Sequence, residues 1–239
     1  MSLRGPANAS RASQAIRLRD VMVRRGSFSL RCRHWDESPG LTVVVGLNGA
    51  GKTTLLKTLA GIQRVTSGRV SGVGNAAFLP QSAQLSSRFR VDDLLTYLAT
   101  LRGVPSAERD ARVSAVVDQT GLSEHRTMRY SALSGGWQQR VLLAQCLLGD
   151  AGCVLLDEPT SSLDIAATRE LWLVLAELSR SRPFVVSTHS ASVALEFADR
   201  VVPIRDGVVH EPHDGAQLRA DYAASELSPE AYLLDVLGR

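Results

Sequence analysis

A glycine-rich segment, GLNGAGKTT at positions 46–54, constrains this chain more than any other feature. It matches the pattern G-x-x-x-x-G-K-[ST], in which backbone N–H groups surround the β-phosphate of a nucleotide, the lysine reaches the β- and γ-phosphates, and the hydroxyl ligates magnesium. A β-branched run at 41–45 precedes the segment and a helical stretch at 52–62 follows it, as the pattern requires. We therefore predict a nucleotide site. Its predicted binding residues are Gly46, Leu47, Asn48, Gly49, Ala50, Gly51, Lys52, Thr53 and Thr54, with Thr53 as a magnesium ligand.

The composition is that of one globular domain, because 239 residues with 44% apolar and 21% charged positions can bury a substantial core. Three cysteines, Cys32, Cys146 and Cys153, form no CxxC pair, so we expect reduced core residues of a cytosolic protein and no disulfide framework or zinc site. No apolar run is long enough to span a bilayer. Residues 1–15 lack the apolar core of a signal peptide, and we expect a disordered tail there.

Charge is distributed unevenly along the chain. The first 120 residues carry 17 cations and 8 anions, whereas the rest carry 10 and 16. Eight arginines lie between Arg4 and Arg33, and a solvated edge rich in strands explains them better than a nucleic-acid or lipid surface, so no nucleic-acid partner is expected. Only two of the 27 cations are lysines, Lys52 and Lys57. This choice indicates that the site at Lys52 needs a compact ammonium group instead of a planar guanidinium.

Strand patterns occur at both ends of a central helical region. Between 15 and 33 apolar residues alternate with polar ones, which predicts two half-buried strands with a turn at Gly26. Short runs typical of buried strands occur at 41–45, 76–80, 153–156 and 184–186. The last two runs flank a helix at 168–178, and no later strand is expected. This order predicts a mainly parallel α/β core.

Helical spacing dominates the middle of the chain, where apolar residues fall at positions 91, 94, 95, 98 and 101. Further helices are predicted at 106–120 and 134–148, so a helical insert of about 82–149 interrupts the core. At the other end, Ser228 and Pro229 have the cap and first-turn pattern of a short last helix.

Two carboxylates, Asp157 and Glu158, follow the buried run at 153–156. The carboxyl edge of a parallel sheet is where such folds bind ligands. We therefore predict that Asp157 holds magnesium, and that Glu158 orients the attacking water or accepts its proton. Two solvated acids at a strand end are the plainer alternative for the pair alone. The phosphate-binding loop favours the catalytic interpretation.

A second helix start with free N–H groups is predicted at Ser134, Gly135 and Gly136, where a capping serine precedes two glycines. Such a start attracts anions, because its unpaired N–H groups and the helix dipole both favour negative charge. A capped helix without any ligand is the plainer interpretation of these three residues alone.

Six segments occur in the order found in the ATP-binding cassette ATPases: GLNGAGKTT, a glutamine after FLP, LSGGWQQR, CVLLDEP, SSLD and STHS. The chain resembles this family over residues 16–210. The resemblance implies that ATP binds with Mg²⁺ between two cassettes paired head to tail, each using the Ser134–Gly136 segment of the other. It also implies that Gln81 senses magnesium and the permease, that Asp164 couples the dimer, and that His189 contacts the γ-phosphate. Lys52, Glu158 and His189 are then the catalytic residues.

The resemblance implies a P-loop NTPase core of the ABC type, with a mainly parallel sheet, an N-terminal antiparallel β subdomain and the helical insert. The expected boundaries are a single ATPase domain at 16–214 and a C-terminal helical tail at 215–239.

Two departures from the family pattern stand out. Trp137 occupies the fifth signature position, where glutamine is usual, and it could pack on the facing subunit, on the nucleotide, or beneath its own helix. The aromatic residue that stacks on adenine is also missing from its usual place, which holds Arg24 and Arg25. Either guanidinium could stack on the base, and Phe28 or Trp35 could substitute.

The interval between Lys52 and Ser134 is too short to hold a long coiled coil, which excludes the chromosome-maintenance relatives in the family. The resemblance favours an ATPase subunit of an exporter, driving a separate membrane permease from the cytoplasmic face and pairing with a second cassette, expected to be an identical chain. The alternatives are an ABC ATPase of a non-transport assembly such as iron–sulfur cluster biogenesis, and a nucleotide-dependent binding switch with little turnover.

Overall fold

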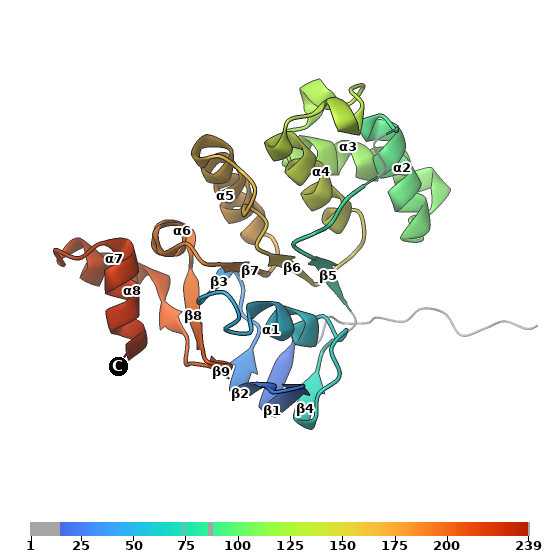
Figure 1. Ribbon diagram of the computed structural model, residues 1–239. Helices are drawn as coiled ribbons and strands as arrows, with labels where there is room; N and C mark the ends of the chain where they lie inside the picture. The colour runs from blue at the N-terminus through green and yellow to red at the C-terminus, as the bar shows by residue number, and fades with distance from the viewer. Residues whose placement is uncertain (1–14, 74, 86–87, 239) are drawn as a thin grey trace, which may run out of the picture.

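The computed structural model describes residues 15–73, 75–85 and 88–238, so nearly all of the predicted tail at 1–15 lies outside the described residues. The described strands form one sheet in the order β4-β1-β2-β9-β8-β3-β7-β6-β5, with β10 paired to β8 (Figure 1). The parallel strands, in their order across the sheet, are β8 (Arg200–Arg205), β3 (Leu41–Val45), β7 (Phe184–Thr188), β6 (Cys153–Asp157) and β5 (Ala76–Leu79). Every residue of β3, β6 and β7 is buried, because helices cover both faces. The predicted parallel α/β core is confirmed.

The antiparallel part of the sheet contains β1 (Arg17–Arg25), β2 (Phe28–Asp36) and β4 (Ser67–Ser71). β1 and β2 form the predicted hairpin, and Gly26 at its turn has φ of +59°. β9 (Val208–Val209) joins the two parts of the sheet, since it pairs parallel with β2 and antiparallel with β8. β10 (His213–Asp214) extends β8.

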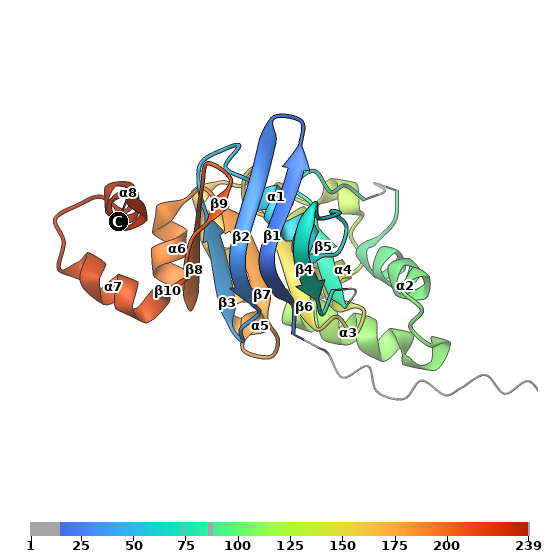
Figure 2. The same cartoon turned by 90° about the horizontal axis from the view of Figure 1, so that it is seen from below.

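The first helix, α1 (Lys52–Leu59), lies between the antiparallel strands and the parallel strands (Figure 2). Its Leu55, Leu56 and Leu59 are fully buried with apolar residues of both groups of strands. The sequence predicted a helix to residue 62, but α1 ends three residues earlier, and Gly61 turns the chain with φ of +71°. The loop at 46–51 is therefore fixed between a buried strand and a buried helix.

The helical insert contains α2 (Val91–Leu101), α3 (Arg109–Gln119) and α4 (Gly135–Leu147), together with 3₁₀ turns at Ser106–Glu108, Ser123–His125 and Tyr130–Ala132. It lies in sequence between β5 and β6 and forms a separate group of helices beside the sheet (Figure 1). Val91, Leu94 and Leu95 are buried as their spacing predicts. Leu101 is wrongly predicted to share that face, since it is 64% exposed at the end of α2.

The C-terminal third adds α5 (Ile165–Ser179), α6 (Ala191–Phe197), α7 (Gly215–Ala223) and α8 (Pro229–Gly238). The predicted cap of α8 is confirmed, because the Ala231 backbone N–H donates to Ser228 Oγ at 3.2 Å. The expectation of no strand after 184–186 is wrong, since β8, β9 and β10 follow it. β8 carries Pro203 in its interior, a residue that normally argues against a central strand. All three cysteines are free and buried, as predicted.

Candidate active site

The loop at 46–51, called here the phosphate loop, connects β3 to the first turn of α1. Glycine is required at Gly46, because a Cβ atom there would lie 2.3 Å from the carbonyl oxygen of Ile204 in β8. Gly49 and Gly51 have φ of +82° and +114°, in the region that side-chain-bearing residues rarely adopt. The glycines thus let the loop approach β8 closely and turn into the first residue of α1.

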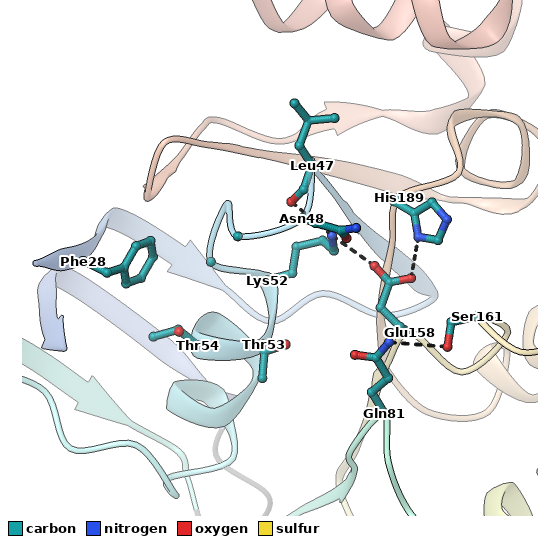
Figure 3. Close-up of a pocket in the computed structure, with 12 residues that line it drawn as sticks. Phe28, Leu47, Asn48, Lys52, Thr53, Thr54, Gln81, Glu158, Ser161 and His189 are labelled. Carbon is teal, nitrogen blue, oxygen red and sulfur yellow. Dashed lines mark hydrogen bonds and ion pairs between the residues drawn. The ribbon is translucent and has the colours of Figure 1, made fainter. Parts of the chain in front are cut away.

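Lys52 is the first residue of α1 and is 6% exposed. Its Nζ donates to the carbonyl oxygens of Gly46 at 2.7 Å and Leu47 at 3.3 Å, and it lies 3.0 Å from Glu158 Oε1 (Figure 3). The ammonium group is therefore held at the centre of the loop, between loop carbonyls and one carboxylate.

The two predicted carboxylates are held by a residue of the neighbouring strand. Ser187 in β7 donates its hydroxyl to Asp157 Oδ1 at 2.7 Å, and its oxygen accepts the Glu158 backbone N–H at 2.9 Å. Glu158 has φ of +48°, an uncommon conformation for a residue with a side chain. The turn directs the Glu158 side chain toward Lys52. Ser187 lies in the STHS segment and in the buried strand β7, but no pattern in the sequence predicts its contacts with Asp157 and Glu158.

Glu158 also contacts His189, which follows β7. His189 Nδ1 lies 2.9 Å from Glu158 Oε2, while the imidazole remains 57% exposed (Figure 3). Among the described residues, Glu158 Oε1 accepts no hydrogen bond, so its partner is the ammonium charge of Lys52. Lys52, Glu158 and His189, the three predicted catalytic residues, thus form one contiguous row.

A cavity of about 620 Å³ brings most of the predicted site together. Phosphate-loop residues, Thr53 and Thr54 form one wall, and Gln81, Glu158 and His189 form the other (Figure 3). Gln81 follows β5 and donates from Nε2 to Ser161 Oγ at 3.5 Å. A neighbouring cavity of about 450 Å³ lies on the other side of the phosphate loop. Both volumes are in the range of small-ligand sites.

The predicted magnesium ligands suit that ion, because Thr53, Gln81 and Asp157 all offer oxygen atoms, which magnesium prefers. Thr53 and Gln81 line the cavity, whereas Asp157 is buried at the end of β6 beside Ser187. Within the described ranges, no cluster of three or more His, Cys, Asp or Glu side chains could hold a metal by itself. A magnesium ion would therefore depend on phosphate oxygens and water as well, which is its usual mode of binding.

The structure does not bring the second predicted anion site into this cavity. Ser134 is the exposed N-cap of α4 and makes no side-chain cap hydrogen bond, and Gly135 is exposed beside it. Asp164 is the N-cap of α5 and accepts the Ala167 backbone N–H at 2.8 Å. These residues lie on the first turns of two neighbouring helices.

The structure shows the surroundings of Trp137 and of the residues that could stack on adenine, the two departures from the family pattern. The Trp137 ring stacks on His125 of its own chain, with centroids 3.9 Å apart. Trp35 is 2% exposed in the core, so it cannot reach a nucleotide, and that expectation is wrong. Phe28 lines both cavities, whereas Arg24 and Arg25 are exposed and belong to the wall of neither.

The profile of a family described as ABC transporter matches residues 37–161. The chain belongs to this family. It is an ATP-binding domain of the ABC type, and such domains are ATPases. The chain is 35% identical over 187 residues to the macrolide export ATP-binding/permease protein MacB of Bradyrhizobium diazoefficiens, covering 71% of this chain and 28% of MacB. It is 32% identical over 207 residues to the thiamine import ATP-binding protein ThiQ of Jannaschia sp., covering 81% of this chain and 90% of ThiQ.

Solved structures share the fold of this ABC domain. The structure of cbiO1 from Clostridium perfringens, part of the ABC transporter complex cbiONQ, has a TM-score of 0.77 at 22% identity, covering 87% of this chain and 92% of cbiO1. Another ATP-binding subunit of an ABC transporter has a TM-score of 0.76 at 20% identity, covering 94% of this chain and 100% of that subunit. Among the helices of the described residues, none is both long and apolar enough to cross a bilayer.

Proposed function

We propose that this chain is the ATP-hydrolysing subunit of an ABC exporter, which pairs head to tail with a second copy and drives a separate membrane permease from the inner face of the membrane. The observation that carries the proposal is the row formed by Lys52, Glu158 and His189 at one cavity, with Glu158 3.0 Å from Lys52 and 2.9 Å from His189. The row joins a phosphate-binding cation to a carboxylate that can accept a proton.

In the proposed reaction, Lys52 and the N–H groups at the start of α1 bind the β- and γ-phosphates and stabilise the charge that develops on them. Magnesium, when bound, neutralises phosphate charge. Glu158 orients the attacking water and accepts its proton. His189 holds Glu158 in place and, being exposed, can also reach the γ-phosphate. Ser187 fixes the backbone from which Asp157 and Glu158 extend.

The head-to-tail pairing is supported by the position of the second anion site. Ser134 and Gly135 lie at the start of α4, where helix N–H groups have no intrahelical partner, and both are exposed and do not line the cavity of their own chain. A second copy presenting the same segment to the cavity would complete the phosphate environment, and Asp164 at the start of α5 would lie in the same contact. ATP would then be the ligand that joins the two chains.

Docking to a permease is supported by exposed apolar side chains on the helical insert. Phe89, Tyr97, Leu101 and Met128 are between 38% and 64% exposed. The rings of Phe89 and Tyr97 stack with centroids 6.2 Å apart, and Leu101 lies one turn beyond Tyr97 on α2. Apolar side chains gathered in this way are typical of a surface that a partner covers.

Export as the direction of transport is supported by the helical insert and C-terminal segment, which resemble those of exporter subunits, and by similarity to MacB and to the pyoverdine export ATP-binding/permease protein PvdT of Pseudomonas entomophila, 33% identical over 210 residues. ThiQ is an importer component, so the identity of the permease decides the direction.

The test is a pull-down of tagged Glu158→Gln chain with magnesium ATP from detergent-solubilised cells of the source organism, with identification of the proteins that co-purify. We expect a multi-span membrane protein, and its relatives would identify the substrate class and direction. A matched Tyr97→Glu/Leu101→Glu variant in the same background should lose that partner and still bind ATP. Recovery of soluble proteins alone would contradict the transporter assignment and favour an assembly factor.

A further inference from the structure

Trp137 lies on the signature helix α4, where the family usually has glutamine, and its half-buried ring packs against its own chain. On one side, the ring stacks on His125 with a centroid distance of 3.9 Å and an angle of 28° between the planes. In addition, Arg140 Cζ lies 4.7 Å from the ring centroid. Aromatic stacking and a cation over an indole are both stabilising contacts. The indole therefore packs against His125 and Arg140 of its own chain and stabilises this part of the insert.

Arg140 connects the helical insert to α5, a helix that lies outside the insert. Its Nη1 donates to the carbonyl oxygen of Thr120 at 3.1 Å, beyond the end of α3. Its Nη2 pairs with Glu170 Oε2 of α5 at 3.1 Å, and the arginine side chain is only 12% exposed. Trp137 thus supports an arginine that links α4 to the residue after α3 and to α5.

The first turns of α4 and α5 lie close together. A Cβ atom on Gly136 would lie 3.0 Å from Ala167 Cβ, and one on Gly135 would lie 3.6 Å from Leu163 Cδ2. Ala167 is also the residue whose N–H is capped by Asp164. The glycine pair and Asp164 are therefore held as one unit, and any rotation of α4 against α5 would separate them.

We propose that Trp137 is a positioning residue for the composite ATP site. By stacking on His125 and holding Arg140, it fixes α4 relative to α5, so that the Ser134–Gly136 N–H groups and Asp164 meet the second cassette together. This inference rests on the head-to-tail pairing proposed above. A glutamine at the same place would have more rotamers and no ring to stack, so it would hold Arg140 less firmly.

Trp137 should therefore affect the ATP-driven pairing of two chains and should not affect ATP binding to a single chain. Binding to the phosphate loop of one chain does not involve α4, so Trp137→Gln should leave it unchanged. ATP-driven pairing of two chains does involve α4, and loss of the stack should raise the dissociation constant of the ATP-bound dimer about three- to tenfold. Trp137→Phe keeps an aromatic face against His125 and Arg140, so it should restore most of the pairing.

The experiment measures dimer fraction against concentration by analytical ultracentrifugation with magnesium ATP, in the Glu158→Gln background. The Glu158→Gln chain is compared with three chains that each carry one further change: Trp137→Gln, Trp137→Phe or Leu173→Gln. Leu173 lies on the exposed face of α5, so Leu173→Gln is the control. ATP affinity is measured separately on dilute, monomeric chains with a fluorescent ATP analogue. We expect Trp137→Gln alone to weaken pairing, with unchanged ATP affinity and Trp137→Phe close to the background.

The outcomes distinguish the two proposals. A Glu158→Gln chain that stays monomeric with ATP would contradict the head-to-tail pairing and the inference with it. A Glu158→Gln chain that pairs equally well with and without Trp137→Gln would overturn the inference alone. Equal loss of ATP affinity and pairing in Trp137→Gln would also overturn it, because the indole would then act on the stability of the whole chain.

Discussion

Lys52 Nζ lies 3.0 Å from Glu158 Oε1, and these two side chains are only 6% and 8% exposed. A buried charge is costly without a partner, so each group stabilises the other while no phosphate is bound. The arrangement also means that a triphosphate must take the ammonium of Lys52 away from Glu158. ATP binding would thereby free the carboxylate for the water molecule.

The first prediction concerns ATP affinity. Glu158→Gln removes the carboxylate that competes with phosphate for Lys52, so the dissociation constant for ATP should fall about tenfold, equivalent to about 1.4 kcal/mol. Titration calorimetry on dilute chains would measure it. Glu177→Gln, an exposed change on α5, is the control and should have no effect. An unchanged or higher dissociation constant in Glu158→Gln would contradict the competition.

The second prediction concerns the close approach of the phosphate loop to β8. Gly46→Ala would place a Cβ atom 2.3 Å from a backbone oxygen, Ile204 O, which cannot move without disturbing the sheet. We expect a loss of about 1 to 3 kcal/mol in the free energy of unfolding and weaker ATP binding. Gly149→Ala is the matched control, since a Cβ atom there meets nothing within 4 Å. Equal melting temperatures for the two variants would refute the steric argument.

The third prediction concerns the base. Phe28 lines both cavities beside the phosphate loop, so its ring is placed to stack on adenine. Phe28→Ala should raise the dissociation constant for ATP about fivefold or more, and leave inorganic triphosphate binding unchanged. Phe28→Tyr should behave as the wild type. Arg25→Ala is the comparison. If Arg25→Ala raises the dissociation constant for ATP and Phe28→Ala does not, the arginine and not the phenylalanine contacts the base.

The fourth prediction concerns the thiols. Burial raises the pKa of Cys32 and of Cys146 to about 12, and it raises the pKa of Cys153 as well. At pH 8 only about one such thiol in ten thousand is ionised, so the native chain should resist iodoacetamide and react at all three positions after denaturation. Because the unfolded thiols ionise near pH 8.5, the stability of the fold should decline as the pH rises above that value. Rapid alkylation of the native chain would contradict the buried placement.

Much of the site was predictable because its residues are fixed by local patterns. The spacing of glycines around Lys52, and the carboxylates after a buried run, each depend on a few adjacent residues. Ser187 could not be predicted in the same way, since its role comes from the pairing of β6 with β7 across the sheet. Local spacing was also misleading at Leu101, which ends α2 beyond the packed part of the insert.

Two other features of the fold depend on contacts between distant segments. Trp137 was open to three interpretations until His125, twelve residues earlier, provided its stacking partner. β8 was missed because Pro203 masks its strand pattern, yet its pairing with β3 places Ile204 against the phosphate loop. Such contacts depend on the folded arrangement and leave no periodic signal in the chain.

Glu158 at this cavity is expected to activate the water that hydrolyses ATP. The most direct measurement is single-turnover hydrolysis of labelled ATP by purified wild-type and Glu158→Gln chains with magnesium. We expect the wild type to convert its bound ATP to ADP, and Glu158→Gln to retain intact ATP because its hydrolysis rate is lower by about a hundredfold or more. Hydrolysis by Glu158→Gln at the wild-type rate would contradict this role of Glu158.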